Sequence, residues 1–415
     1  MGLVFSCSEK IFLLLFYFIT YVSSQQWNLV ASPITSSSVV ASDLDFADGF
    51  VAPGPVPSLI NGTPVVAIGS IESDGATLTT FYYLSQNPLS WASFATHSPG
   101  MAQSYDAFSL KFTLGRIYLA LRIAGEDIAS VLRSGTSGSD GEFEGCYAFD
   151  GFLFDFAIDH ETGDMRLATS PDNKTIGVQS YAKKGWDVYP ASDEFSTFLP
   201  LLLPSPIGSI VSISASPATS DGLLIIAVST SFNVTSIFSA PLSSTSKDLP
   251  TQLGKPLIGS QAAITAGGGT ACVSVFDSDL SLQVSCIDLT APNALWIDLG
   301  LADPPNSSEI GLSPAIAIAL GNTGSRTVFA AARADKDNAA KLLIARCTLS
   351  NIDQPVSNSC LAGQWTNMTL VAPNPITAFD LKVNHFNDTY TEVFVIITTG
   401  QATSSDQVLI YKYVE

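Results

Sequence analysis

The sequence predicts an all-β protein, a single β-propeller of seven four-stranded blades that is closed by its N-terminal strand. Three observations predict this fold: short apolar strand-like runs throughout the 415-residue chain, a unit that recurs seven times, and two complementary chain ends. A row of two or three β-sandwiches also explains the strands and turns, but it does not explain the ends. We expect residues 1–24 to be a cleaved signal peptide and residues 25–415 to form the propeller domain.

Strand signals dominate the chain. Short runs rich in β-branched residues are bounded by clusters of Gly, Pro, Asn, Asp and Ser, which is the pattern of strands separated by turns. The clearest runs are residues 63–71, 116–124, 223–232, 326–334 and 392–400. No segment carries a sustained apolar stripe of helical period with capping residues, so the fold class is all-β.

Two sequence features recur. All five Trp residues open a strand-like run and are followed by Pro four to eight residues later: Trp27, Trp91, Trp186, Trp296 and Trp365. The second feature is a short alternating strand whose copies start at intervals of about 56 residues, a spacing that suits four-stranded blades. Its seven copies lie at residues 44–47, 108–111, 154–157, 211–214, 262–265, 316–319 and 379–382.

The two ends of the chain complete each other. The last unit has three evident strands, at 377–383, 392–399 and 408–414, and lacks a Trp-led fourth strand. Residues 26–30 (QWNLV) supply that element at the N-terminus. Pairing them removes two exposed sheet edges, which would otherwise invite aggregation. We therefore expect Trp27 to lie in a strand paired with residues 408–414.

The N-terminus carries an export signal. Lys10 precedes an apolar run at residues 11–22, and Val22 and Ser24 place small residues before a cut at Gln25. The run is too short to span a bilayer comfortably, so the mature protein is expected outside the cell without a membrane span. The remaining chain has six candidate N-glycosylation sites: Asn61, Asn173, Asn233, Asn306, Asn367 and Asn387.

The cysteines fit an oxidising compartment. Cys272 and Cys286 flank one turn, and Cys347 and Cys360 flank another, so each pair is expected to form a cross-strand disulfide. Cys146 is left over, either free or available for an intermolecular bond. Zinc binding is disfavoured because no Cys-x-x-Cys motif or nearby His occurs.

The charge excludes some partners. The net charge is −19, with 18 Lys and Arg against 37 Asp and Glu. A surface this acidic repels nucleic acid and anionic lipid. It suits neutral or cationic partners such as sugars, Ca²⁺ or basic proteins.

Recognised catalytic motifs are missing. The three His residues, His97, His160 and His385, lie in no metal-binding or nucleophile motif. The nearest pattern to a calcium loop is residues 43–49, where Asp43, Asp45 and Asp48 are candidate ligands. The third Asp is displaced by one position and no later acid completes the set, so an acidic strand end followed by a turn is the favoured interpretation.

The polar positions of the alternating strands form the main candidate site. In register they are Asp45, Ser109, Asp155, Ser212, Ala263, Ala317 and Asp380. If these strands are the innermost of each blade, three carboxylates converge on the mouth of the central channel. The alternative interpretation is that these side chains bind water or neighbouring backbone N–H groups.

Two functional hypotheses remain. The favoured one is an extracellular binding module of lectin or adhesion type that recognises a glycan or a protein. The alternative is a secreted hydrolase or lyase that acts on polysaccharide with carboxylates at the channel mouth. The sequence names no catalytic residue and no certain cofactor, with Ca²⁺ as the candidate ion.

Overall fold

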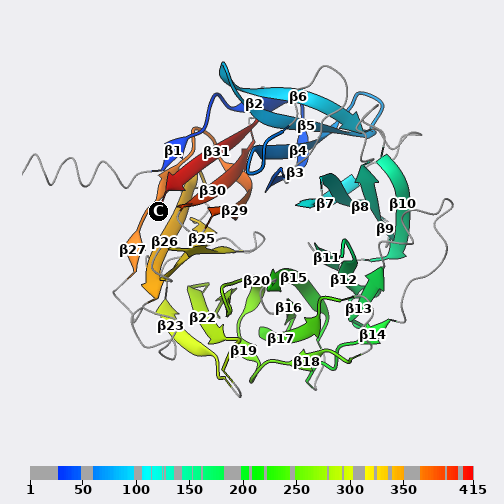
Figure 1. Ribbon diagram of the computed structural model, residues 1–415, viewed down its shortest axis with the longest axis vertical. Helices are drawn as coiled ribbons and strands as arrows, with labels where there is room; N and C mark the ends of the chain where they lie inside the picture. Colours follow the sequence, from blue (N-terminus) through cyan, green and yellow to red (C-terminus); the bar gives the residue numbers. More distant parts are fainter. Residues whose placement is uncertain are drawn as a thin grey trace, which may run out of the picture.

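The computed structural model describes most of the chain, and its strands form seven antiparallel sheets arranged in a ring (Figure 1). No helix occurs in the described residues. These residues are 27–47, 59–97, 105–113, 115–123, 125, 128–134, 143–151, 153–159, 162–181, 198–204, 208–218, 222–243, 248–277, 280–291, 294–301, 314–321, 325–334, 339–349, 365–387, 390–400 and 405–414. The seven-bladed β-propeller predicted from the sequence is confirmed.

The first four blades follow in chain order. Blade 1 contains β3 (Val39–Phe46), β4 (Pro64–Ile71), β5 (Thr77–Gln86) and β6 (Leu89–His97). Blade 2 contains β7 (Tyr105–Thr113), β8 (Arg116–Ile123), β9 (Ile128–Ser134) and β10 (Phe143–Asp150). Blade 3 contains β11 (Leu153–Ile158), β12 (Met165–Ser170), β13 (Gly177–Tyr181) and β14 (Leu199–Pro200). Blade 4 contains β15 (Ile210–Ala218), β16 (Leu223–Thr230), β17 (Val234–Pro241), β18 (Thr251–Gln252) and β19 (Leu257–Ile258).

The last three blades complete the ring. Blade 5 contains β20 (Ser260–Gly267), β21 (Thr270–Phe276), β22 (Leu282–Asp288) and β23 (Ile297–Leu301). Blade 6 contains β24 (Ala315–Leu320), β25 (Arg326–Arg333), β26 (Lys341–Leu349), β27 (Thr366–Asn367) and β28 (Leu370–Val371). Blade 7 combines β29 (Ile376–Asn387), β30 (Tyr390–Thr399) and β31 (Asp406–Val414) with β1 (Asn28–Leu29) and β2 (Ile34–Ser36).

The predicted alternating strands are the innermost strands of the blades. All seven copies fall within β3, β7, β11, β15, β20, β24 and β29. Each of these strands begins its sheet and faces the centre of the ring in Figure 1. The sequence period therefore marks the blades correctly.

The N-terminal strand closes the ring as predicted. Asn28 and Leu29 pair with Lys412 and Tyr411, and the N–H of Val30 donates to the carbonyl of Ile410 at 2.8 Å. One detail of the prediction is wrong: Trp27 lies directly before β1 rather than within it. The centroid of its indole ring lies 5.7 Å from that of the Tyr413 ring.

The recurring Trp residues join neighbouring blades. The indole N–H of Trp91 donates to the carbonyl of Val30 at 3.2 Å. Trp296 donates to Leu253 at 2.7 Å, and Trp365 donates to Leu299 at 3.2 Å. Each acceptor lies in or just after the outer strand of the preceding blade, which explains why a Trp opens the outer strand repeatedly. Trp186 lies outside the described residues.

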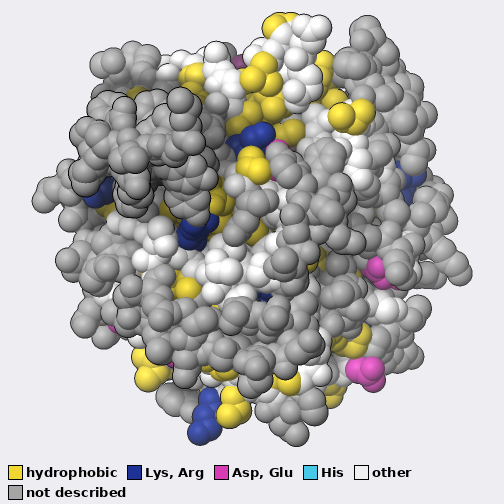
Figure 2. Space-filling view, turned by 60° about the vertical axis from the view of Figure 1, so that its left-hand side comes forward, with side chains coloured by type: hydrophobic (Ala, Val, Ile, Leu, Met, Phe, Trp, Pro, Cys, Tyr) yellow, Lys and Arg dark blue, Asp and Glu magenta, His cyan; other side chains and the backbone are white. Residues whose placement is uncertain are grey.

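The core lies between the blades. One buried cluster, for example, packs Val65 and Phe81 of blade 1 against Leu110 and Leu119 of blade 2. Hydrophobic side chains that remain exposed lie in small separate groups on the face shown in Figure 2. The described residues contain no helix of the length and apolarity needed to cross a bilayer.

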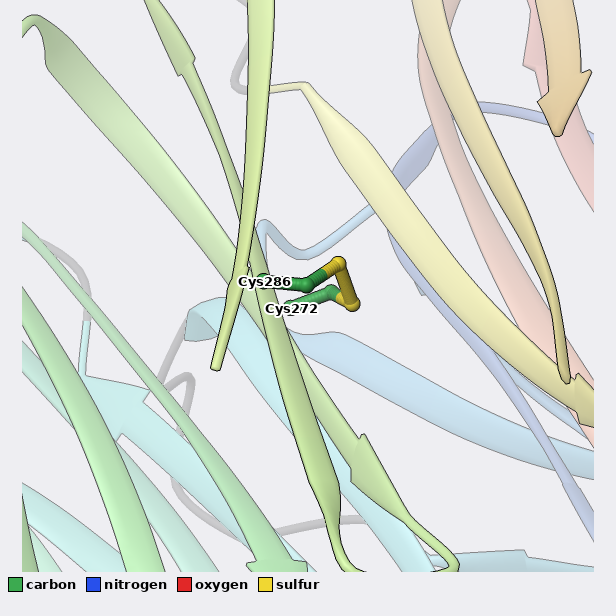
Figure 3. Close-up of a disulfide and its surroundings, with 2 residues drawn as sticks. All are labelled: Cys272 and Cys286. Atoms are coloured by element: carbon green, nitrogen blue, oxygen red, sulfur yellow. A yellow bond between two sulfur atoms is a disulfide. The ribbon is translucent and has the colours of Figure 1, made fainter. Parts of the chain in front are cut away.

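The disulfide predicted between Cys272 and Cys286 is confirmed (Figure 3). The two residues face each other across β21 and β22, and both are fully buried. They pack in one cluster with Cys347 of blade 6, which is itself disulfide-bonded. Its predicted partner, Cys360, lies outside the described residues. Cys146 lies in β10, but its side chain is also outside the described part.

Candidate functional site

A cavity of about 900 Å³ occupies the centre of the ring. Residues from all seven innermost strands line it, so every blade contributes to its wall. The propeller fold alone creates this space, because the blades pack through their faces and leave their inner edges around the axis. The chemistry of the wall depends on which side chains those edges carry.

The wall divides into two arcs of different chemistry. The charged arc is formed by β29, β3, β7 and β11, and its charged residues are Asp43, Asp45, Lys111, Asp155, Asp380 and Lys382. The hydroxyl arc is formed by β15, β20 and β24, and its described lining residues carry no charge. It presents hydroxyl and aliphatic side chains, among them Ser212, Ser214, Ser216, Ile213, Ile264 and Ile318.

The carboxylates of the charged arc bridge to the following blade. Oδ2 of Asp45 accepts the N–H of Phe112 at 2.7 Å, and Oδ2 of Asp155 accepts the N–H of Ala215 at 2.7 Å. Oδ2 of Asp43 accepts the N–H of Leu110 at 2.8 Å. Asp45 and Asp155 therefore make hydrogen bonds to neighbouring backbone N–H groups, which is the alternative to ligand binding that the sequence left open. Their role in binding a ligand stays a prediction.

Serine hydroxyls make the same bridge in the hydroxyl arc. Oγ of Ser214 accepts the N–H of Ile264 at 3.2 Å, and Oγ of Ser216 accepts the N–H of Ala266 at 2.9 Å. Each bridge connects an innermost strand to the innermost strand of the next blade. These strands are sheet edges, so their N–H groups need acceptors from outside their own sheet.

The bridges also define which residues lie level with one another. Asp45 accepts the N–H of Phe112, so Asp45 lies level with Lys111 of the next blade. Asp155 accepts the N–H of Ala215, so Asp155 lies level with Ser214 of the next blade. Ser109 and Ser212, which the sequence register aligned with them, lie two residues earlier on the same strand faces. Both still line the cavity. Oγ of Ser212 has no hydrogen-bond partner among the described residues.

Lys382 is paired with two carboxylates. Its Nζ lies 3.0 Å from Oδ2 of Asp380 and 3.3 Å from Oδ1 of Asp43. Burial alone would lower the pKa of the Lys382 ammonium, but the charges of Asp380, Asp43 and Asp45 raise this pKa well above its ordinary value. Asp380 is the more open partner, with 43% of its side chain exposed against 10% for Asp43.

Two carboxyl groups have raised pKa values. Burial is the largest cause for both Asp45 and Asp155, and it raises their pKa above the ordinary value. Lys111, Lys382 and main-chain N–H groups act in the opposite direction for both residues. Burial of these two carboxylates in their ionised form therefore costs free energy, and the two lysines offset only part of that cost.

The lysines and Asp43 were missed as members of this site. Alternation places Lys111 on the same strand face as Ser109, and Lys382 on the same face as Asp380. The signal was thus present in the repeated units at 108–111 and 379–382. Both polar positions of these strands line the cavity, so one position from each strand describes the wall only in part.

The candidate calcium ligands and the His residues named from the sequence lie in different parts of the structure. Asp43 and Asp45 lie within β3 rather than in a loop, and Asp48 lies outside the described residues. No group of three or more potential ligands among the described residues is arranged to hold a metal ion. His97 lies in β6, and burial lowers the pKa of its imidazole. His160 and the side chain of His385 are outside the described part.

The glycosylation candidates lie mainly at the surface. Asn61, Asn233 and Asn367 are exposed, and Asn173 is partly exposed. Asn306 and the side chain of Asn387 lie outside the described residues. These positions leave N-glycosylation as a prediction that the accessible sites permit.

Comparisons with known proteins support the propeller fold but assign the chain to no family. No family model matches the chain, and no curated protein matches it. Among solved structures, the chain is similar to the BP39L lectin of Burkholderia pseudomallei, with a TM-score of 0.54 and 12% identity over 89% of this chain and 98% of the lectin. At that identity the likeness establishes the fold alone.

Two further structures are similar at lower scores. The WD40 domain of SCAP from fission yeast has a TM-score of 0.49 and 12% identity, over 94% of this chain and 98% of that one. An α-L-arabinanase of Penicillium chrysogenum has a TM-score of 0.46 and 10% identity, over 93% of this chain and 97% of that one.

Proposed function

We propose that this protein is an exported binding module that holds a sugar unit of a glycan in its central cavity. One observation carries the proposal: the fold does not require the charge of the charged arc. Ser214 and Ser216 make the inter-blade bridges with neutral hydroxyls, whereas Asp43, Asp45 and Asp155 make them with carboxylates. Charge that is costly to bury and unnecessary for the fold is typical of a binding site.

Both arcs suit the hydroxyl groups of a sugar. A carboxylate that already accepts one or two N–H groups is fixed in orientation and keeps lone pairs for hydroxyl donors. The hydroxyl arc adds neutral hydroxyl groups such as that of Ser214, whereas Ile264 and Ile318 are buried between blades and leave little apolar surface to the cavity. A cavity of about 900 Å³ is within the usual range for sites that bind small ligands.

An enzyme is the second candidate. Burial raises the pKa of Asp45 and Asp155, while the Asp380 side chain is 43% exposed. Carboxyl groups in unlike environments are the usual arrangement for general acid and base catalysis of glycoside cleavage. A hydrolase or lyase acting on polysaccharide would use the same cavity, so both activities need to be measured on the same protein.

The proposal is tested with protein exported from a eukaryotic host. The mature protein is applied to a glycan array, and the affinity for the best glycan is measured by titration calorimetry. Asp380→Asn is the main variant, because Asp380 is the most open carboxylate of the Lys382 cluster. We expect its affinity to fall about 10-fold or more, as for loss of one hydrogen bond to a charged group.

The matched control is Asp298→Asn. Asp298 is exposed, its carboxylate also accepts a local N–H, that of Gly300, and it does not line the cavity. Binding by the control should equal that of the unchanged protein. Failure of any glycan to bind, or equal binding by the Asp380 variant, refutes the proposal. Release of reducing ends from a polysaccharide panel favours the enzyme instead.

A further inference from the structure

The hairpin loop between β16 and β17 has an unusual exposed tip. It consists of three exposed residues, Ser231, Phe232 and Asn233, and the N–H of Asn233 donates to the carbonyl of Thr230 at 3.1 Å. Asn233 has a φ of 55°, the left-handed conformation that closes a three-residue hairpin loop. Asn tolerates this conformation better than most residues, so the backbone explains part of its presence.

Two large apolar side chains lie beside Asn233. Phe232 precedes it and is 57% exposed, and Ile258 ends β19 and is 75% exposed. The N–H of Gly259 donates to the carbonyl of Asn233 at 2.7 Å, which brings the end of β19 next to the loop. Phe232 lies on the β15 side of the hairpin and Ile258 on the β17 side, and neither the turn nor the sheet needs an apolar side chain at these exposed positions.

A contact with Gly208 fixes the position of the Phe232 ring. A Cβ atom at Gly208 would lie 2.9 Å from Cδ2 of the Phe232 ring, so the ring rests on the backbone of Gly208. The absence of a side chain at 208 allows this contact. The other side of the ring remains free to receive a ligand, because more than half of the side chain is exposed.

We propose that an N-linked glycan on Asn233 covers the exposed face of Phe232, with its first sugar ring packed on the aromatic ring. Asn233-Val234-Thr235 is an acceptor sequence for this modification. The slightly positive C–H groups of a pyranose ring pack well against the negative face of an aromatic ring. The inference rests on export, which belongs to the proposed function, but it is independent of any ligand in the cavity.

The burial of Thr235 sets the order of events. Thr235 is fully buried, and its hydroxyl bonds to the hydroxyl of Ser229 at 2.8 Å and to the carbonyl of Gly259 at 2.9 Å. The transferase must read this hydroxyl, so the sugar is attached before blade 4 folds. In that step Nδ2 of Asn233 bonds to C1 of the sugar, the C1–O bond to a lipid diphosphate donor breaks, and the amide proton is released to a base of the transferase.

Asn173 provides a matched site without the apolar surface. It lies in the equivalent turn of blade 3, its φ is 53°, and its carbonyl accepts the N–H of Ile210 at 2.6 Å. Its neighbours are the exposed charged residues Asp172 and Lys174 instead of an aromatic ring. A glycan on Asn173 would therefore extend into solvent, whereas the glycan on Asn233 would lie on protein.

The first experiment measures occupancy and release. Protein secreted by a eukaryotic host is mapped by mass spectrometry, and the native protein is then treated with a peptide N-glycosidase. We expect Asn233 to be occupied, with a glycan released about fivefold more slowly than that of Asn173. Phe232→Ser should abolish the difference. An unoccupied Asn233 in exported protein, or equal release rates, overturns the inference.

The second experiment measures stability without changing Asn233. Melting temperatures are compared for the unchanged protein and Phe232→Ser, each with and without its glycans. Glycan removal should lower the melting temperature of the unchanged protein by about 2 °C more than that of the variant. An equal loss in both proteins overturns the inference. So does a change of oligomeric state in Phe232→Ser, which would assign the surface to a second copy of the chain.

Discussion

The charged arc and the hydroxyl arc join neighbouring blades by the same kind of hydrogen bond but with different acceptors. In the charged arc, Asp43, Asp45 and Asp155 accept N–H groups at 2.7–2.8 Å. In the hydroxyl arc, Ser214 and Ser216 accept them at 3.2 and 2.9 Å. The shorter distances are those expected of bonds to an ionised acceptor, which are also the stronger ones.

This difference shows that the fold requires a hydrogen-bond acceptor at these positions but does not require the acceptor to be charged. Any acceptor satisfies the N–H groups at the inner sheet edges, as the serines demonstrate. The carboxylates add a burial cost, which is visible in the raised pKa of Asp45 and Asp155, and they require Lys111 and Lys382 as counter-charges. The charged arc is thus the part of the wall whose chemistry the fold leaves unexplained.

The largest effect is expected at Asp43, the most buried of the charged residues. Asp43→Ala leaves the N–H of Leu110 without its acceptor and removes one partner of Lys382. The free energy of unfolding should fall by about 3 kcal/mol, measured by urea denaturation at pH 7. The matched change in the hydroxyl arc, Ser216→Ala, should cost about 1 kcal/mol. Equal losses at the two sites would contradict the comparison.

A smaller effect is expected at Lys382. Lys382→Met leaves Asp380 and Asp43 without their shared cation, but Asp380 is 43% exposed and water replaces part of the interaction. The loss should be about 1.5 kcal/mol at low ionic strength and smaller in about 1 M salt, which screens the exposed part of the interaction. Lys412→Met breaks the ion pair of Lys412 with Glu392 and is the matched comparison, which should lose less because Lys412 has one carboxylate partner among the described residues instead of two. A loss independent of the salt concentration would exclude the ion pairs as its cause.

The sequence predicts the fold better than the site because the two depend on different distances along the chain. The spacing of the alternating strands marks all seven blades, and the Trp-led N-terminal run predicts the closure with β31. The Cys272–Cys286 disulfide follows from two strands that meet across one turn. The disulfide joins residues that are close in the sequence, and the other features recur at similar intervals along the chain. Each can therefore be recognised from the sequence of single strands.

The site depends on how blades stack, which no single strand encodes. Alternation tells which face of β7 carries Ser109 and Lys111, but not which of the two lies level with Asp45. That level is fixed by the bond to Phe112, 67 residues from Asp45. The ion pair between Lys382 and Asp43 likewise joins the first and last blades, so it emerges only when the ring closes.

The raised pKa of Asp155 predicts a smaller, pH-dependent difference between the unchanged protein and Asp155→Asn. Between the ordinary pKa of 3.8 and the raised value, the folded state holds more protons than the unfolded state, so this residue's contribution to stability falls as pH rises. The stability lost in Asp155→Asn should therefore be larger at pH 4 than at pH 7, measured by urea denaturation.

Asp172 is the control of opposite sign. Main-chain N–H groups of Thr175 and Lys174 lower the pKa of its carboxyl, so its contribution is present at neutral pH and disappears as pH falls through the lowered value. The stability lost in Asp172→Asn should be larger at pH 7 than at pH 4. If both variants respond to pH with the same sign, burial is not what raises the pKa of Asp155.

The smallest effect is expected at Ser214, in the hydroxyl arc. Its bridge to the N–H of Ile264 is 3.2 Å long, near the limit for a hydrogen bond, and the hydroxyl borders the open cavity. In Ser214→Ala, water from the cavity can take over the N–H, so the loss should be about 0.5 kcal/mol. Because neither the donor nor the acceptor titrates, the loss should be equal at pH 4 and pH 7. A pH-dependent loss would mean that charges of the opposite arc reach Ser214 across the cavity, and the two arcs would then have to be treated as one electrostatic site.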